Sequence, residues 1–266
     1  PPPTLSSRRR HTRSCLKSRG LGDVYKRQDI MSDKNDSKAL ADGHSNENGF
    51  VVRVWDLPTR IFHWLLVCCV VGSLFTGNMG GLAMTNHEWC GVAILAMILF
   101  RLVWGAVGGV HARFSSFLKG PRLVLDYARR LFGAESNGYL GHNPLGGWSI
   151  IAMLASLCVQ VATGLFANDD ILTEGPLVFL ISKALSDQLT YLHHANKWIL
   201  ISLLTVHMLA VAFYWLVKRE NLVKPMVTGH KIWPVKREDS DDKKVMAMGI
   251  FSAIAIIIYL FIYGIQ

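Results

Sequence analysis

Five long apolar runs constrain this chain more than any other feature of its sequence. Each has about 20 residues, the length of an α-helix that crosses a hydrocarbon core of about 30 Å. Hydrophobic residues make up 51% of the chain and charged residues 18%, which is too apolar for one soluble core. Backbone polar groups must be satisfied within each segment in lipid. We therefore predict an all-α fold, a transmembrane up-and-down four-helix bundle with an additional C-terminal transmembrane helix, with helices at about 57–77, 88–108, 146–167, 193–217 and 245–264.

The first 49 residues lie outside this apolar pattern. Residues 1–30 are rich in Arg and Ser and resemble translated sequencing-adapter sequence, so we expect a non-native segment. They contain eight Lys or Arg and two Asp, which supplies +6 of the formal +9. The remaining charge gives no reason to expect nucleic acid as a partner. Residues 31–49 lack apolar content and are expected to form a disordered cytoplasmic tail.

Basic residues are concentrated in alternate connections, which predicts the orientation in the membrane. Residues 78–87 contain no Lys or Arg, and residues 168–192 contain only Lys183, so both connections are expected in the periplasm. The connections after the second and fourth runs are rich in Lys and Arg, and the last of them includes a cytoplasmic linker at 230–244. The pattern predicts a multi-pass protein of the bacterial inner membrane, surrounded by lipid, with a cytoplasmic N-terminus and a periplasmic C-terminus. A short surface helix is expected after Pro121.

The cysteines argue against covalent attachment of a cofactor. Apart from Cys15, they all lie in the apolar runs, and the sequence contains no CxxC motif. Covalent c-type haem and iron–sulfur ligation are therefore disfavoured. We interpret these thiols, at Cys68, Cys69, Cys90 and Cys158, as small buried hydrophobic side chains.

Four histidines lie within or at the mouths of the apolar runs, where an ionisable side chain is costly and indicates function. His193 and His207 are 14 residues apart, so they return to within about 40° of one helix face, about 21 Å apart along its axis. Up-and-down topology places His63 level with His207 on the cytoplasmic side and His87 level with His193 on the periplasmic side. His194 is rotated by about 140° from the face of His207 and is the second choice as a ligand.

Two facing imidazoles are the axial ligands that a haem iron requires, so this pattern predicts two non-covalent haem b groups. Gly77, 14 residues after His63, would leave room for a porphyrin at the periplasmic site, and Gly91 would clear space there too. Arg101, 14 residues after His87, would pair with a propionate at the cytoplasmic site. Two plainer readings stay open: the first glycine ends a helix, and the arginine extends its charge to the membrane surface.

Three stretches resemble the bacterial cytochrome b561 and nickel–iron hydrogenase b-type cytochrome family: VWDLPTRIFHW, NHEWCG followed by FR, and LHHANKWILISLLTVH. The resemblance covers residues 51 to about 229, so we expect a dihaem membrane domain at 50–229. It implies haem ligation by the four histidines above. It also implies that the protein exchanges electrons with the quinone pool. The protein would be an electron-transfer cytochrome or a subunit of a quinone-linked oxidoreductase, and not itself an enzyme. Two further segments resemble those of a subgroup that stands apart from dedicated hydrogenase subunits: GHNPLGGW at 141–148 and GLFANDD at 164–170.

The expected function is respiratory electron transport between quinone and a periplasmic c-type cytochrome or redox enzyme subunit. One alternative is a metal-binding membrane protein that uses the same histidines, although no HExxH motif accompanies them. Another is a haem-free membrane anchor. His111, His142 and His230 lie in cytoplasmic connections, where solvated or hydrogen-bonded roles are expected, and contact of His142 with quinone or a propionate is the alternative. The fifth run contains no histidine and is interpreted as an anchor or a subunit contact.

Overall fold

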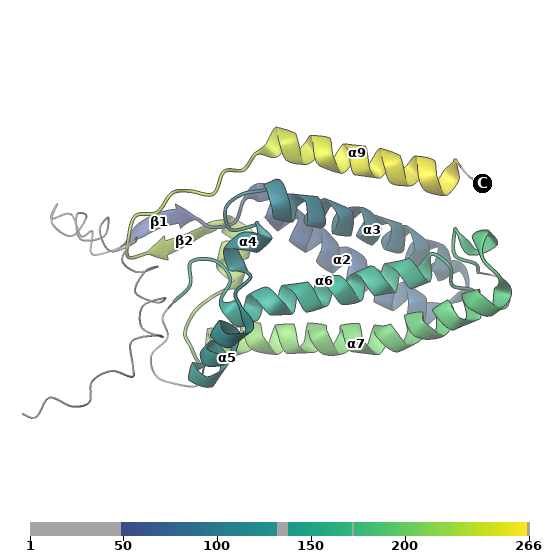
Figure 1. Cartoon of the computed structure of the whole chain (residues 1–266), viewed down its shortest axis with the longest axis horizontal. Helices are drawn as coiled ribbons and strands as arrows, with labels where there is room; N and C mark the ends of the chain where they lie inside the picture. The colour runs from purple at the N-terminus through teal and green to yellow at the C-terminus, as the bar shows by residue number, and fades with distance from the viewer. Residues whose placement is uncertain (1–48, 132–137, 172, 265–266) are drawn as a thin grey trace, which may run out of the picture. The chain divides into compact units, whose positions relative to one another are not determined.

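The computed structural model describes residues 49–131, 138–171 and 173–264, and within them five helices are long and apolar enough to cross a membrane (Figure 1). This confirms the predicted number and class of membrane helices. The segments predicted for residues 1–30 and 31–49 lie outside the described residues, except for Gly49. The long helices are α2 (Leu57–Met79), α3 (Met84–Val107), α6 (Pro144–Gly164), α7 (Lys183–Leu216) and α9 (Lys244–Tyr263).

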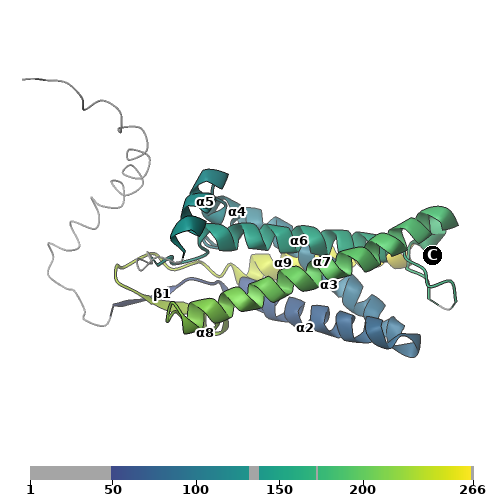
Figure 2. The same cartoon turned by 90° about the horizontal axis from the view of Figure 1, so that it is seen from below.

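The long helices pack as two pairs, α2 with α3 and α6 with α7, and α3 also contacts α6 and α9. Figure 2 shows the two pairs on opposite sides of the assembly. A short 3-10 turn, η1 (Gly81–Ala83), joins α2 to α3, so these two helices run in opposite directions. Buried side chains such as Ile98, Leu157 and Leu200 fill the space between the helices. Many outward-facing Leu, Ile and Val side chains are exposed, as a lipid-facing surface requires.

A buried aspartate fixes the start of α2 and therefore the position of the first histidine-bearing turn. The Asp56 carboxylate caps the helix by accepting a hydrogen bond from Thr59 N–H at 2.7 Å. It also accepts hydrogen bonds from Trp104 Nε1–H at 3.3 Å and Gly109 N–H at 3.2 Å. The N-terminus of α2 is thus tied to the C-terminus of α3. We call this end of the helices the Leu57 end and the opposite end the Met79 end.

Several predicted helix boundaries need correction. α7 begins at Lys183 instead of residue 193, because Ser182 caps a polar first turn that hydropathy does not detect. α3 begins at Met84 instead of residue 88, directly after η1. α6 ends at Gly164 instead of residue 167, and the chain then turns into the α6–α7 connection. The other long helices agree with the predicted ranges to within two residues.

The prediction of a purely helical fold is incomplete, because β1 (Phe50–Arg53) pairs with β2 (His230–Trp233) in a two-stranded sheet. β2 lies at the start of the predicted linker 230–244. The rest of this segment packs back on β1, since Ser240 N–H donates to the Arg53 carbonyl oxygen at 2.9 Å. The shorter helices are α4 (Phe114–Phe117), α5 (Pro121–Arg130), η2 (Val178–Leu180) and α8 (Val223–Thr228), of which α5 is the helix predicted after Pro121.

Candidate functional site

His87 and His193 face each other across the gap between the two helix pairs. His87 lies in the first turns of α3 and His193 lies in α7, and both side chains are half-buried. Their ring centroids are 6.1 Å apart and the ring planes meet at 78°. A ligating histidine nitrogen lies about 2 Å from its metal, so two rings on opposite sides of one metal have centroids roughly 6 Å apart. The pair therefore has the spacing of two axial ligands.

Hydrogen bonds to the outer nitrogens fix the protonation of both rings. His87 Nδ1 lies 2.9 Å from the carbonyl oxygen of Ser73, and His193 Nδ1 lies 2.9 Å from that of Gln160. A carbonyl oxygen only accepts, so each Nδ1 carries the hydrogen and each Nε2 keeps a lone pair. Such partners orient a ligating imidazole and raise its basicity. The side-chain amide of Gln160 lies 3.1 Å from His193 Nε2 and donates to that lone pair.

Two glycines make room for these imidazoles. A Cβ at Gly77 would lie 2.8 Å from His87 Nδ1, and a Cβ at Gly164 would lie 3.0 Å from His193 Cε1. Gly77 thus clears the ligand ring itself, while the predicted clearance for a porphyrin stays a prediction. A Cβ at Gly91 would meet nothing within 4 Å. Gly164 was not predicted as a site residue, although it stands near the end of its apolar run as Gly77 does.

A pocket of about 340 Å³ lies between the helix pairs and has both histidines in its wall. Gly77 and Gly91 also line it, and most of its surface is apolar. His194 and Lys197 lie at the same pocket. The side chain of His194 is exposed, whereas His193 is half-buried and faces His87. The geometry therefore favours His193 over its neighbour as the ligand.

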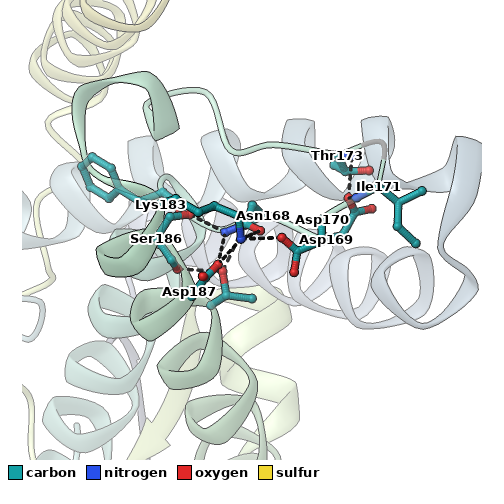
Figure 3. A network of polar contacts seen from close by, with 10 residues as sticks. Asn168, Asp169, Asp170, Ile171, Thr173, Lys183, Ser186 and Asp187 are labelled. Atoms are coloured by element: carbon teal, nitrogen blue, oxygen red, sulfur yellow. Dashed lines mark hydrogen bonds and ion pairs between the residues drawn. The ribbon is translucent and has the colours of Figure 1, made fainter.

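The α6–α7 connection lies along the Met79 end of this pocket, and polar contacts bind it to the first turns of α7 (Figure 3). Asn168 Nδ2 donates to Ser186 Oγ at 2.5 Å and to Asp187 Oδ1 at 3.0 Å. Lys183 Nζ donates to Asn168 Oδ1 at 3.1 Å and forms ion pairs with Asp170 and Asp187. Lys183 thus neutralises part of the negative charge of Asp170 and Asp187. These contacts hold the connection in place beside the pocket.

His63 on α2 and His207 on α7 form the second predicted pair, nearer the Leu57 end. Both side chains are half-buried, and the two imidazoles are close enough to interact electrostatically. Among the described residues, His63 Nδ1 is shielded from solvent and has no hydrogen-bond partner. A buried polar atom without a partner costs about 1–3 kcal/mol. The polar groups at this pair are therefore less fully satisfied than those of His87 and His193.

Arg101 is buried in α3 near the same end, with only 4% of its surface exposed. Its guanidinium carbon lies 4.6 Å from the ring centroid of Phe114. Within the described part of the chain, its Nη1 has no hydrogen-bond partner. His142 interacts electrostatically with Arg101, His63 and His207, so these four groups lie together. This burial disagrees with the plainer reading, in which the arginine extends to the membrane surface.

The family profile of prokaryotic cytochrome b561 matches residues 54–229, which include all four histidines. The chain belongs to this family. Three relatives named probable Ni/Fe-hydrogenase B-type cytochrome subunit match most of it. The relative from Rhizobium leguminosarum bv. viciae is 24% identical over 224 residues, covering 71% of this chain and 91% of the relative. That from Bradyrhizobium diazoefficiens is 25% identical over 234 residues (74% and 93%), and that from Azotobacter vinelandii is 26% identical over 229 residues (72% and 91%).

No solved structure matches the chain. Membership of the cytochrome b561 family confirms the resemblance seen in the sequence, and it makes this chain a membrane electron-transfer component with haem b, and not a catalytic enzyme.

The residues of the site fit a b-type haem. With each Nδ1 engaged by a carbonyl oxygen, the two Nε2 atoms are the ones that an iron would take, and the Gln160 amide, which donates to His193 Nε2, would have to give way to it. The pocket walls are mostly apolar, as a porphyrin ring requires. At the second pair, outside this pocket, the unpartnered Nη1 of Arg101 suits a carboxylate. Within the described residues, no three His, Cys, Asp or Glu side chains gather as a metal-binding group. A haem iron takes only its two axial ligands from the protein.

Proposed function

We propose that this cytochrome b561 family member is a dihaem protein that transfers electrons across the bacterial inner membrane, between the quinone pool and a periplasmic redox partner. The observation that carries the proposal is the His87–His193 pair, with ring centroids 6.1 Å apart and both Nδ1 atoms bonded to carbonyl oxygens. Bound haem would supply an iron that changes between the ferric and ferrous states. The two imidazoles would hold that iron, and the apolar pocket walls would exclude water from it.

The second haem is proposed at His63 and His207. His207 follows His193 by 14 residues on α7, so one helix face contributes a ligand to each haem, about 21 Å apart along its axis. Arg101 is the proposed partner of a propionate at this second site. Gly77 and Gly91 are proposed to clear space for the haem at the first site.

The charges of the connections support an orientation. Basic residues gather at the Leu57 end, for example Arg129 and Arg130 in the last turn of α5, and the positive-inside rule assigns this end to the cytoplasm. The tail at 31–49 and the linker at 230–244 are then cytoplasmic. The Met79 end and the C-terminus face the periplasm. A c-type cytochrome or a redox enzyme subunit is the proposed partner there, and the name of the relatives makes a nickel–iron hydrogenase one candidate.

Haem stoichiometry tests this function most directly. We expect two haems per chain in a pyridine haemochrome assay of the purified protein, both extracted by acidified organic solvent because no CxxC motif tethers them. A reduced-minus-oxidised visible spectrum should show b-type bands. One haem per chain would contradict the second site, and the lack of any haem would favour a haem-free anchor.

A further inference from the structure

His142 occupies an aromatic box at the Leu57 end. Its ring centroid lies 4.5 Å from that of Trp55 and 4.9 Å from that of Phe117. Its Nδ1 is shielded from solvent and has no hydrogen-bond partner in the described part of the chain. The sequence predicts a solvated or hydrogen-bonded histidine at this position. The structure corrects this expectation, because residues far apart in the sequence enclose the ring.

Arg101 presents a second unsatisfied donor close to His142. The nearest acid that acts on it, Asp56, already accepts three hydrogen bonds from Thr59, Trp104 and Gly109. Among the described ion pairs, none joins Arg101 to a carboxylate. A buried guanidinium without a partner is strongly destabilising, so a ligand with negative charge is expected at its free Nη1.

His142 can serve the same ligand as a neutral donor. Burial, and then the positive charge of Arg101, lower the pKa of His142 to about 3, so its imidazole is uncharged at physiological pH. A neutral imidazole still offers one N–H group. Arg101 and His142 both approach the ring of Phe117, since the guanidinium carbon lies 6.0 Å and the His142 centroid 4.9 Å from its centroid. One charged donor and one neutral donor are thus close together, and His142 also interacts electrostatically with His63 and His207.

We propose that Arg101 and His142 together bind one carboxylate, a propionate of the haem held by His63 and His207. The inference rests on the proposed function, since it requires the second haem. A propionate fits better than a quinone headgroup, because the buried guanidinium requires an anion and quinone oxygens are neutral. The guanidinium offers two parallel N–H groups to a carboxylate, and the imidazole adds a third donor from another direction.

Redox titration of purified two-haem protein tests the pair. His142→Phe keeps an aromatic ring between Trp55 and Phe117 but removes the donor. A propionate that loses a hydrogen-bond donor keeps more of its negative charge, and this charge favours ferric over ferrous iron. We therefore expect about a tenfold shift toward ferric haem at this site, or a reduction potential lower by about 59 mV for one electron. The other haem should not shift. His142→Gln, which retains an N–H donor, should shift less, and exposed His230→Phe is the matched control.

Comparison with His207→Ala, which removes the site, assigns the shifted component. In the double variant with Arg101→Leu, the shifts should be less than additive, because both donors serve one carboxylate.

Two normal potentials in His142→Phe would overturn the inference, and a changed response to quinone analogues at unchanged potentials would indicate a quinone site instead. Loss of the haem from His142→Phe but not His142→Gln would support it, whereas loss from both would mean packing alone. Fewer than two haems in the unmodified protein would instead refute the proposed function.

Discussion

At the scale of single residues, the choice between two adjacent histidines is the sharpest test of the first site. His193 is half-buried and faces His87, whereas the neighbouring His194 is exposed. We expect His193→Ala to remove one haem per chain, since each iron depends on two axial ligands. The matched control His194→Ala should retain both haems by pyridine haemochrome assay. If His194→Ala removes the haem and His193→Ala does not, the ligand has been placed one residue too early.

Arg101 offers a second test at this scale. Arg101 is only 4% exposed and, like His63 and His207, interacts with His142, although its helix carries the proposed ligand of the other site. We expect Arg101→Leu to shift the haem at His63 and His207 by at least about tenfold toward ferric iron, or about 59 mV. Arg101→Lys, which keeps the charge but not the paired N–H groups, should shift it less.

Redox titration measures both variants against the histidine variants that lack one site. Equal shifts in the two haems, or no shift in either, would mean that Arg101 only positions its helix.

The sequence predicted the histidines of both sites but not their supporting groups. A 14-residue spacing is visible in the sequence, because helical geometry alone relates His193 to His207. The partners Ser73 and Gln160 act mainly through backbone carbonyl oxygens, which every residue possesses. His142 was expected to be solvated or hydrogen-bonded, since only the folded chain brings Trp55 and Phe117 around it.

At the scale of helices and strands, hydropathy predicted the apolar membrane spans but not the polar helical turns and the strands outside them. All five apolar runs correspond to helices, because a membrane span must be apolar along its length. The first ten residues of α7 contain Lys183 and Asp187 and lie outside any apolar run. The strands β1 and β2 have four residues each and are far apart in the sequence, so no local sequence pattern predicted their pairing.

The segment after β2 forms a clip at the start of α2 that should respond to pH. The Asp242 carboxylate accepts a hydrogen bond from Leu57 N–H at 2.8 Å and forms ion pairs with Arg53 and Lys244. Burial acts in the opposite direction, but this bond and these charges together lower the pKa of Asp242 below its ordinary 3.8. The carboxylate therefore stabilises the folded state at pH values above 3.8, its ordinary pKa in the unfolded chain. This stabilisation is lost as the pH falls through the lower pKa of the folded state.

We expect the melting temperature in detergent to fall between pH 5 and pH 3, and Asp242→Asn to remove part of that fall. At pH 7 this variant should melt a few degrees lower, since a partly exposed pair of this kind contributes about 1 kcal/mol or less. Glu238→Gln, at an exposed position in the same segment, serves as the control. An identical pH dependence in Asp242→Asn and the unmodified protein would exclude the clip as the source.

At the scale of the whole molecule, α7 connects the two proposed haem sites. It carries His193 opposite α3 and His207 near α2, so a shift of this one helix would alter ligation at both depths. The network of Asn168, Lys183 and Asp187 fixes its first turns. α9 contributes no histidine and no residue to the pocket wall, and it packs on α3 through Ile258 and Ile262. The proposed electron transfer across the membrane would therefore depend on the four other long helices.

Orientation determines which haem meets which partner, and it can be tested independently of haem content. Alkaline phosphatase needs the oxidising periplasm to form its disulfides. We expect an active fusion after Gly264 and an inactive one after Thr228, because the positive-inside rule places the basic Leu57 end in the cytoplasm. A fusion to green fluorescent protein at each position is the matched control and should give the opposite pattern. The reverse result for both reporters would place the His87–His193 site on the cytoplasmic side, and the redox partner would then have to be sought there.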